Sequence, residues 1–245
     1  MAQSAPEMDT RRDDERFLTS IDWLHSRHSF SFANHYDPSN THHGLLIVSN
    51  DDIIQPTTGF STHPHQDMEI VTWVLEGELE HKDSEGHTGI IYPGLAQRMS
   101  AGTGIWHSEM NPVNDKPVRL VQMWVLPDTE RIRPAYQQLD ISAELDRGGL
   151  IPVASGQDHD AAISIRQKQA VLWAGRLKAG EVVTVPDAAY VHVYVARGGV
   201  TLDGAGALNE GDAVRLTGAG ALSLTASTTD GAEVLIWEMG AGVDR

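Results

Sequence analysis

Short apolar runs, separated by polar and turn-forming residues, recur along most of the chain. The runs are rich in β-branched and aromatic residues, and each is closed by Gly, Asn, Asp or Pro; they are "HGLLIVSNDD", "MEIVTWVLEGELEH", "HTGIIYPG", "VRLVQMWVLP", "AVLWAGRLKAG", "YVHVYVARGGVTLDG" and "AEVLIWEM". No long helical period is present, and only residues 19–27 and 142–149 could form short helices. Many short strands at regular spacing are typical of a sandwich or barrel, so the pattern predicts an all-β protein.

The strand pattern is interrupted once and then resumes. Residues 126–150 contain two prolines, many charges and no long apolar run. On either side of them, "VLEGELEH" (74–81) and "VARGGVTL" (195–202) share the outline of a strand, a glycine and a second strand. This outline indicates an internal duplication. We therefore predict the following units: a mobile arm over residues 1–16, a first barrel over 17–127, a linker over 128–160 and a second barrel over 161–245.

Two pairs of candidate metal ligands lie within the first predicted barrel. His63 and His65 are two residues apart in "GFSTHPHQDMEI", and His107 and Glu109 repeat the spacing in "GTGIWHSEMN". Side chains at i and i+2 of a strand point to the same face, so two inward-facing strands would bring all four together. Imidazole and carboxylate ligands suit a divalent transition metal, and on an octahedral ion they leave two positions open. One His-x-His alone is weak evidence, because surface histidines are common; the second matched pair strengthens it.

The residues around the pairs favour a barrel rim. Pro64 has no backbone N–H, so the segment from His63 to His65 is not expected in the middle of a fully paired sheet. Gly102 and Gly104 permit a tight bend before the second pair.

Charge and composition exclude several function classes. The net charge is −16, from 34 acidic and 18 basic residues, and the basic residues are scattered. Such a surface repels phosphate groups, so we expect no nucleic-acid and no membrane-surface binding. The chain contains no cysteine, which excludes disulfides, thiolate metal sites and cysteine nucleophiles. Neither an export signal nor a stretch of ~20 apolar residues is found, so the expected location is the cytoplasm.

Two longer segments carry a resemblance to a known family. They are "HPHQDMEIVTWVLEGELEHKDSEGHTG" (63–89) and "PGLAQRMSAGTGIWHSEMNP" (93–112). Together they resemble the N-terminal cupin domain of the pirin family, including its bacterial quercetinase-like members, and the likeness extends over about residues 20–127. The resemblance implies two tandem cupin barrels with one metal ion in the first. It places the metal ligands at His63, His65, His107 and Glu109.

Other polar residues are interpreted as structural. Most cupins take a glutamate from the first motif, at the position where this chain has Ile70, and Glu69 beside it should point away from the barrel interior as an exterior charge. The second half has Thr184 and Pro186 where the first has its histidine pair, and is expected to be a degenerate cupin without metal. His192 is expected there as a hydrogen-bonded core residue. Three further histidines are expected to be solvated, namely His81, His87 and His159.

The family resemblance also implies an activity. Quercetinase-like pirins open the flavonol quercetin with dioxygen and release carbon monoxide. The resemblance favours iron(II), although the ligand types also suit Zn, Ni, Mn, Co or Cu. Glu109 would act as a ligand or as the catalytic base for the flavonol 3-hydroxyl. Two alternatives remain open: a metal-redox-sensing regulator that acts through a protein partner, and a metal-stabilised scaffold. A monomer is expected.

Overall fold

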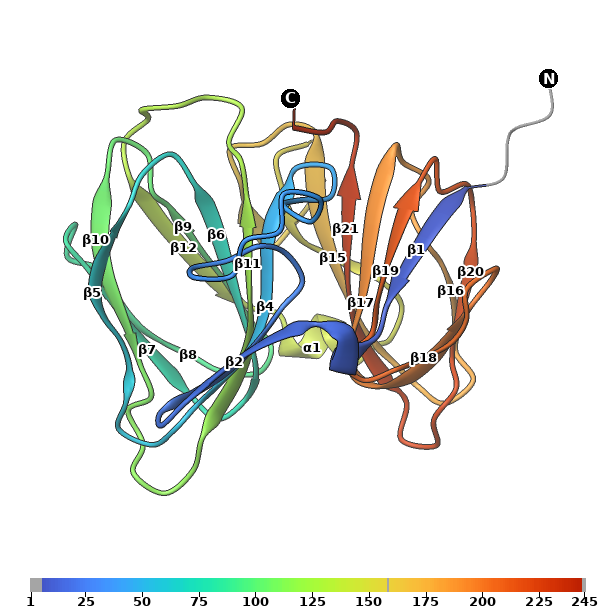
Figure 1. Ribbon diagram of the computed structural model, residues 1–245, viewed down its shortest axis with the longest axis horizontal. Helices are drawn as coiled ribbons and strands as arrows, with labels where there is room; N and C mark the ends of the chain where they lie inside the picture. Colours follow the sequence, from blue (N-terminus) through green and yellow to red (C-terminus); the bar gives the residue numbers. More distant parts are fainter. Residues whose placement is uncertain (1–5, 158, 244–245) are drawn as a thin grey trace.

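The computed structural model describes residues 6–157 and 159–243 and contains two β-barrels side by side (Figure 1). The first barrel is built from two sheets. One has seven strands in the order β12 (Ala135–Asp140), β9 (Leu95–Ser100), β6 (Glu69–Glu76), β11 (Val118–Val125), β4 (Leu46–Ile54), β3 (Leu24–His28) and β2 (Phe17–Ile21). The other has four strands in the order β5 (Gly59–His65), β10 (Ile105–Met110), β7 (Leu79–Asp83) and β8 (Thr88–Ile91).

The second barrel consists of one ten-stranded sheet that folds around its own core. Its main path runs β1 (Glu7–Arg11), β19 (Ala213–Thr217), β17 (Tyr190–Leu202), β21 (Ala232–Met239), β15 (Ala170–Leu177), β13 (Ile151–Ser155) and β14 (Ile163–Ser164). Strands β18 (Gly206–Asn209) and β20 (Ser223–Ala226) pair with β17, and β16 (Val182–Thr184) pairs with β20. Valine and leucine side chains fill the interior of this barrel. The all-β fold of two tandem cupin barrels is confirmed.

The two barrels share a hydrophobic core at their interface. Strand β6 shows how: Ile70 and Val74 belong to clusters inside the first barrel, whereas Val71 and Trp73 belong to a cluster with Trp237 of the second. The indole N–H of Trp73 donates to a carboxylate oxygen of Glu233 at 2.7 Å, across the interface. Because both faces of β6 are buried, its sequence is a nearly continuous apolar run.

A buried polar network reinforces this interface. The Arg119 guanidinium donates to both carboxylate oxygens of Asp51, at 3.0 and 2.8 Å, and the Tyr194 hydroxyl of the second barrel donates to the same carboxylate. Asp51 is 8 % exposed, and these partners satisfy its buried oxygens. The network belongs to the interface between the barrels and not to either interior.

The segment predicted as a mobile arm is largely ordered, and this prediction is wrong for residues 7–16. Strand β1 pairs antiparallel with β19 of the second barrel, and a short 3-10 helix, η1 (Asp13–Glu15), leads to the first (Figure 1). Arg16 is 5 % exposed and donates to the carbonyl oxygens of Gly211 and Arg27, one in each barrel. Backbone pairing therefore orders a segment that has no apolar period. Residues 1–5 lie outside the described part of the chain.

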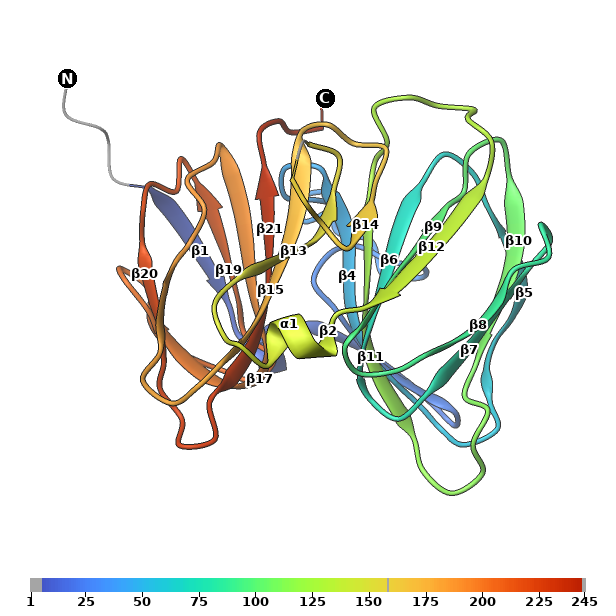
Figure 2. The same cartoon turned by 180° about the vertical axis from the view of Figure 1, so that it is seen from behind.

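The predicted linker also carries regular structure. Strand β12 extends the first barrel, β13 pairs with β15 in the second, and helix α1 (Ser142–Leu145) lies between the barrels (Figure 2). Ile141 and Leu145 are buried in the shared core and anchor this crossing. The possible helix over residues 19–27 is not formed, because β2 and β3 make a hairpin there. No helix in the described ranges has the length and apolar character that crossing a membrane requires.

Candidate metal centre

Strands β5 and β10 place the two predicted pairs side by side. The strands are antiparallel neighbours, and His107 lies opposite His63 in their register. His63 and His65 are half-buried while Pro64 between them is exposed, and His107 and Glu109 are each 2 % exposed. The alternation of a strand therefore directs both pairs toward the barrel interior. β5 is the edge strand of its sheet, which accommodates Pro64 as the sequence predicts.

The predicted bend before β10 is present. Gly102 and Gly104 have φ values of +49° and +132°, in the region that favours glycine. A Cβ atom on Gly102 would lie 2.2 Å from the carbonyl oxygen of Ile132, so no side chain fits there. The two glycines let the chain turn tightly into the strand that carries His107.

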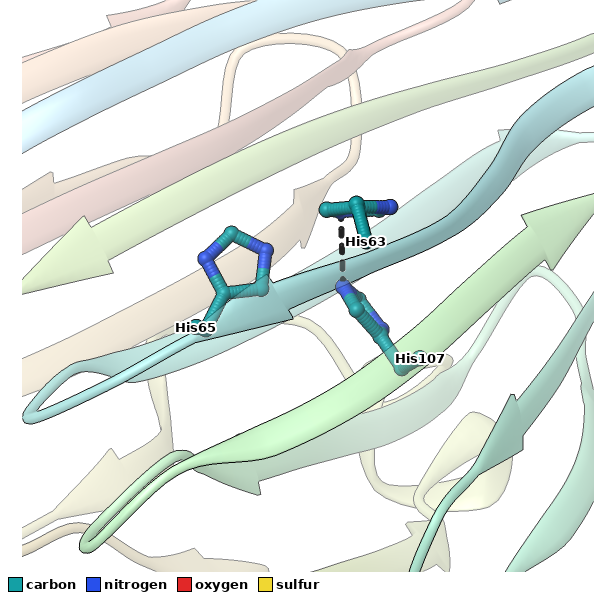
Figure 3. A group of neighbouring side chains, drawn as sticks. All are labelled: His63, His65 and His107. Carbon is teal, nitrogen blue, oxygen red and sulfur yellow. Dashed lines mark hydrogen bonds between the residues drawn. The ribbon is translucent and has the colours of Figure 1, made fainter.

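Three imidazole rings meet at the barrel interior (Figure 3). The ring centroids of His63 and His107 are 4.5 Å apart, those of His63 and His65 are 4.8 Å apart, and those of His65 and His107 are 4.9 Å apart. One nitrogen from each ring can be chosen so that all three lie within 4.8 Å of one another. Glu109 joins His107 and His81 in a second, overlapping group of the same kind.

The hydrogen bonds leave the facing nitrogens available as ligands. Nδ1 of His63 donates to the carbonyl oxygen of Ser61 at 2.8 Å, so its Nε2 carries a lone pair. This Nε2 lies 3.1 Å from Nε2 of His107, and two lone pairs so close require a proton or a cation between them. Nε2 of His65 is buried and has no hydrogen-bond partner within the described chain. A metal ion would satisfy all three nitrogens, so the donor set fits one.

Burial keeps two of these imidazoles neutral. Burial, together with the neighbouring His107 and His63, lowers the pKa of His65 to about 4. Burial, together with His63 and His81, lowers the pKa of His107 to about 3. At neutral pH both rings are therefore unprotonated at one nitrogen, which is the form that binds metals.

Two side chains from the opposite sheet hold the carboxylate of Glu109. The Gln122 amide donates to one oxygen at 2.6 Å, and the Thr72 hydroxyl donates to the other at 3.3 Å. Trp124 in turn donates its indole N–H to the amide oxygen of Gln122 at 3.2 Å, which fixes the amide orientation. Glu109 is thus an oriented carboxylate beside the imidazole cluster.

His81, expected to be solvated, instead lies behind the cluster with 0 % exposure. Its Nε2 is 3.2 Å from a carboxylate oxygen of Asp83, and its Nδ1 is 3.5 Å from Nδ1 of His107. If the carboxylate accepts from Nε2–H of His81, then Nδ1 of His81 accepts from Nδ1–H of His107. This order leaves the lone pair of His107 on Nε2, which faces His63.

We expect His81→Phe to weaken metal binding by about 10- to 100-fold, because such outer partners orient the ligands. Phenylalanine retains the stacking of His81 on Tyr136, whose ring centroids are 4.8 Å apart. His87→Phe is the matched control, since His87 also stacks on Tyr136 and bonds Asp83 without an observed contact to His107. Competition with a chromophoric chelator measures the affinity. Equal metal retention by the two variants would contradict this role.

A cavity of about 250 Å³ opens beside the imidazoles. Its partly exposed rim includes Thr19, Phe32 and Phe60, while its floor is buried. The indole of Trp124 meets the ring of His65 edge to face, at 4.8 Å between centroids. The remaining lining residues are Leu24, Ser26, His28, Ala33, Asn50, Asp52, His63, Glu109 and Gln122. The cavity therefore has apolar walls and two polar regions, one at the imidazoles and Glu109 and one around Asp52.

Comparison with known proteins identifies the family. The Pirin family model matches residues 10–125, and the model for the quercetinase C-terminal cupin domain matches residues 152–239. Quercetin 2,3-dioxygenase of Escherichia coli is 37 % identical over 230 residues, which cover 94 % of this chain and 97 % of that protein. The chain belongs to the pirin family.

Two other pirin relatives cover nearly the whole chain. A Mycobacterium tuberculosis protein with the provisional name quercetin 2,3-dioxygenase is 56 % identical over 235 residues, covering 96 % of each protein. The crystal structure of the bacterial pirin YhhW of Escherichia coli in complex with nickel(II) is 35 % identical, with a TM-score of 0.87. It matches 96 % of this chain and 100 % of its own.

The surroundings of four other polar residues in this pirin differ from those expected. Glu69 does point away from the barrel interior, but it is 1 % exposed: the Ser100 hydroxyl donates to it at 2.9 Å, and the backbone of Arg166 in the second barrel also bonds to it. His192 lies at the interface and not in the second barrel's interior, which Val191 and Val193 occupy. It is 1 % exposed, as a core residue should be, but its Nε2 has no hydrogen-bond partner within the described chain. His87 and His159 are half-buried and hydrogen-bonded.

Asp52 is a buried acid in the cavity floor of this pirin. Burial raises its pKa from the usual 3.8 to about 7, although the Ser26 hydroxyl opposes the shift. The folded protein therefore keeps this proton at pH values where the unfolded chain has released it. The stabilisation is complete below about pH 4 and is lost as pH rises toward 7, at about 1.4 kcal/mol for each pKa unit.

We therefore expect the metal-free protein to lose more stability between pH 5 and pH 8 than metal-free Asp52→Asn does. The amide has the same shape as the acid and does not ionise. Thermal unfolding of both proteins across this pH range tests the expectation. Parallel stability curves would show that Asp52 does not titrate there.

Proposed function

We propose that this protein is a metal-dependent dioxygenase that opens flavonols such as quercetin. His63, His65, His107 and Glu109 would hold one divalent ion, for which we propose iron(II). The observation that carries the proposal is the convergence of three imidazoles at an apolar-walled cavity, with a buried Nε2 of His65 that no described group satisfies. The name of the Escherichia coli relative supports the proposed activity, and the nickel complex of the related pirin supports metal binding.

Some residues of the site would act on the flavonol 3-hydroxyl, and others would bind the aromatic rings. When bound, the ion would supply positive charge that favours the deprotonated flavonol 3-hydroxyl. Glu109, held by Gln122 and Thr72, is the carboxylate placed to accept that proton. Phe32, Phe60 and the other apolar lining residues would bind the aromatic rings and keep water from them.

Turnover by protein reconstituted with defined metals tests the proposal. The metal-free protein is loaded separately with Fe(II), Ni(II), Mn(II), Co(II), Cu(II) or Zn(II), and quercetin absorbance is followed under oxygen together with carbon monoxide release. We expect at least one metal to support turnover and Glu109→Gln to slow it. Absence of turnover with every metal would refute the proposal. If the metal then still raised the melting temperature strongly, its role would be structural.

A further inference from the structure

We propose that Asp52 binds a hydroxyl group of the substrate remote from the metal, so that the site selects aromatic ligands with a second hydrogen-bond donor. The inference rests on the proposed function and deepens it. It concerns the class of flavonol that the cavity takes, which the imidazole cluster does not determine.

Asp51 and Asp52 are consecutive residues with opposite surroundings. Strand alternation turns Asp51 to the interface between the barrels, where Arg119 and Tyr194 satisfy its carboxylate. The same alternation turns Asp52 into the cavity, where it is 2 % exposed. Its Oδ1 has no hydrogen-bond partner among the described residues.

No described residue of the cavity lining brings a permanent cation to this carboxyl group. The cavity lining includes neither lysine nor arginine, and its histidines lie among the proposed ligands or, as His28, bond to Thr19 and Ser26. A buried carboxyl oxygen without a donor destabilises the folded protein, so such a group is normally paired. A ligand hydroxyl that enters the cavity would provide the missing donor.

The position of Asp52 relative to the imidazoles defines the shape of that ligand. Asp52 lies on β4 in the seven-stranded sheet, whereas His63 and His107 lie on the four-stranded sheet that faces it. Apolar side chains, including Leu24 and Trp124, line the space they share. The occupant would therefore be an aromatic molecule that turns a metal-binding oxygen to the imidazoles and a separate hydroxyl donor to Asp52.

Ligand binding without turnover tests this inference. The protein is loaded with nickel(II), kept free of oxygen and titrated with quercetin or with 3-hydroxyflavone, which has the metal-binding oxygens but no other hydroxyl. The flavonol absorbance shift gives Kd for each. We expect wild type to bind quercetin more tightly and Asp52→Leu to weaken quercetin binding by about tenfold or more. Binding of 3-hydroxyflavone should change by less than about threefold.

The variants and outcomes separate this inference from the proposed function. Asp115→Asn, which alters an exposed turn carboxylate, is the control and should bind like wild type. If Asp52→Leu does not fold, Asp52→Ser replaces it, with the same expected selectivity loss. If Asp52→Leu weakens the binding of both flavonols equally, or weakens the binding of neither, the role of Asp52 is overturned while the proposed function stands. If wild type binds neither flavonol, the proposed function fails as well.

Discussion

The variant His107→Ala is expected to retain almost no metal and to lose flavonol turnover. His107 belongs to both groups of potential ligands, and its Nε2 lies 3.1 Å from that of His63. Its removal also deprives His81 of its contact at Nδ1. We therefore expect metal affinity to fall by more than the 10- to 100-fold that is typical of losing an outer partner.

Elemental analysis after dialysis measures this effect directly. Wild type should retain about one ion per chain, the number that one set of ligands can hold. His25→Ala is the control, because His25 is exposed on β3 and its ring bonds only to Ser20 among the contacts observed. Full metal content in His107→Ala would place the ion elsewhere and remove the basis of the proposed function.

The core of this site follows from local sequence rules. The i, i+2 spacing is enough to put His63 with His65, and His107 with Glu109, on one face of a strand. Pro64 is tolerated because β5 is an edge strand, a place that its missing N–H already favours. These relations depend only on residues that are close together in the sequence, so sequence alone can predict them.

The surroundings of the site depend on pairing between distant strands. His81 contacts His107 only because β7 pairs with β10, and no local pattern distinguishes it from an exposed histidine in a turn. Asp52 enters the cavity because of the alternation along β4, yet a run of Asn50, Asp51 and Asp52 gives no sign of which residue points inward. The signal that could have found them is the burial that strand alternation imposes once the register is known.

The difference between local patterns and distant strand pairing also explains which parts of the fold could be predicted from the sequence. Two barrels are predictable from repeated strands and turns, whereas β1 depends on backbone bonds between residues 7–11 and 213–217. Burial on both faces also removes the polar alternation that would mark the inner side of β6, so the sequence does not indicate that Trp73 faces the second barrel. The interface is therefore a property of the folded pair of barrels and not of either strand pattern.

The interface should contribute strongly to stability, and Trp73→Ala is expected to reveal this. Trp73 is 0 % exposed, and its indole spans the interface to Glu233. Replacing a buried tryptophan by alanine costs about 3–5 kcal/mol, and here it also removes the hydrogen bond to a carboxylate that is 7 % exposed. For a chain of this size we expect the melting temperature to fall by about 10 °C.

Trp106→Ala provides the matched comparison, because Trp106 is also a tryptophan but is 53 % exposed on β10. Its loss should change the free energy of unfolding by about 0.5 kcal/mol or little more. Thermal and urea unfolding, followed by tryptophan fluorescence and circular dichroism, measure both variants. In wild type we expect the two probes to report one coincident transition, since the largest apolar cluster includes residues of both barrels. In Trp73→Ala the barrels should begin to unfold separately. A Trp73→Ala protein as stable as Trp106→Ala would mean that each barrel is stable without the other, and that the shared core adds little to either.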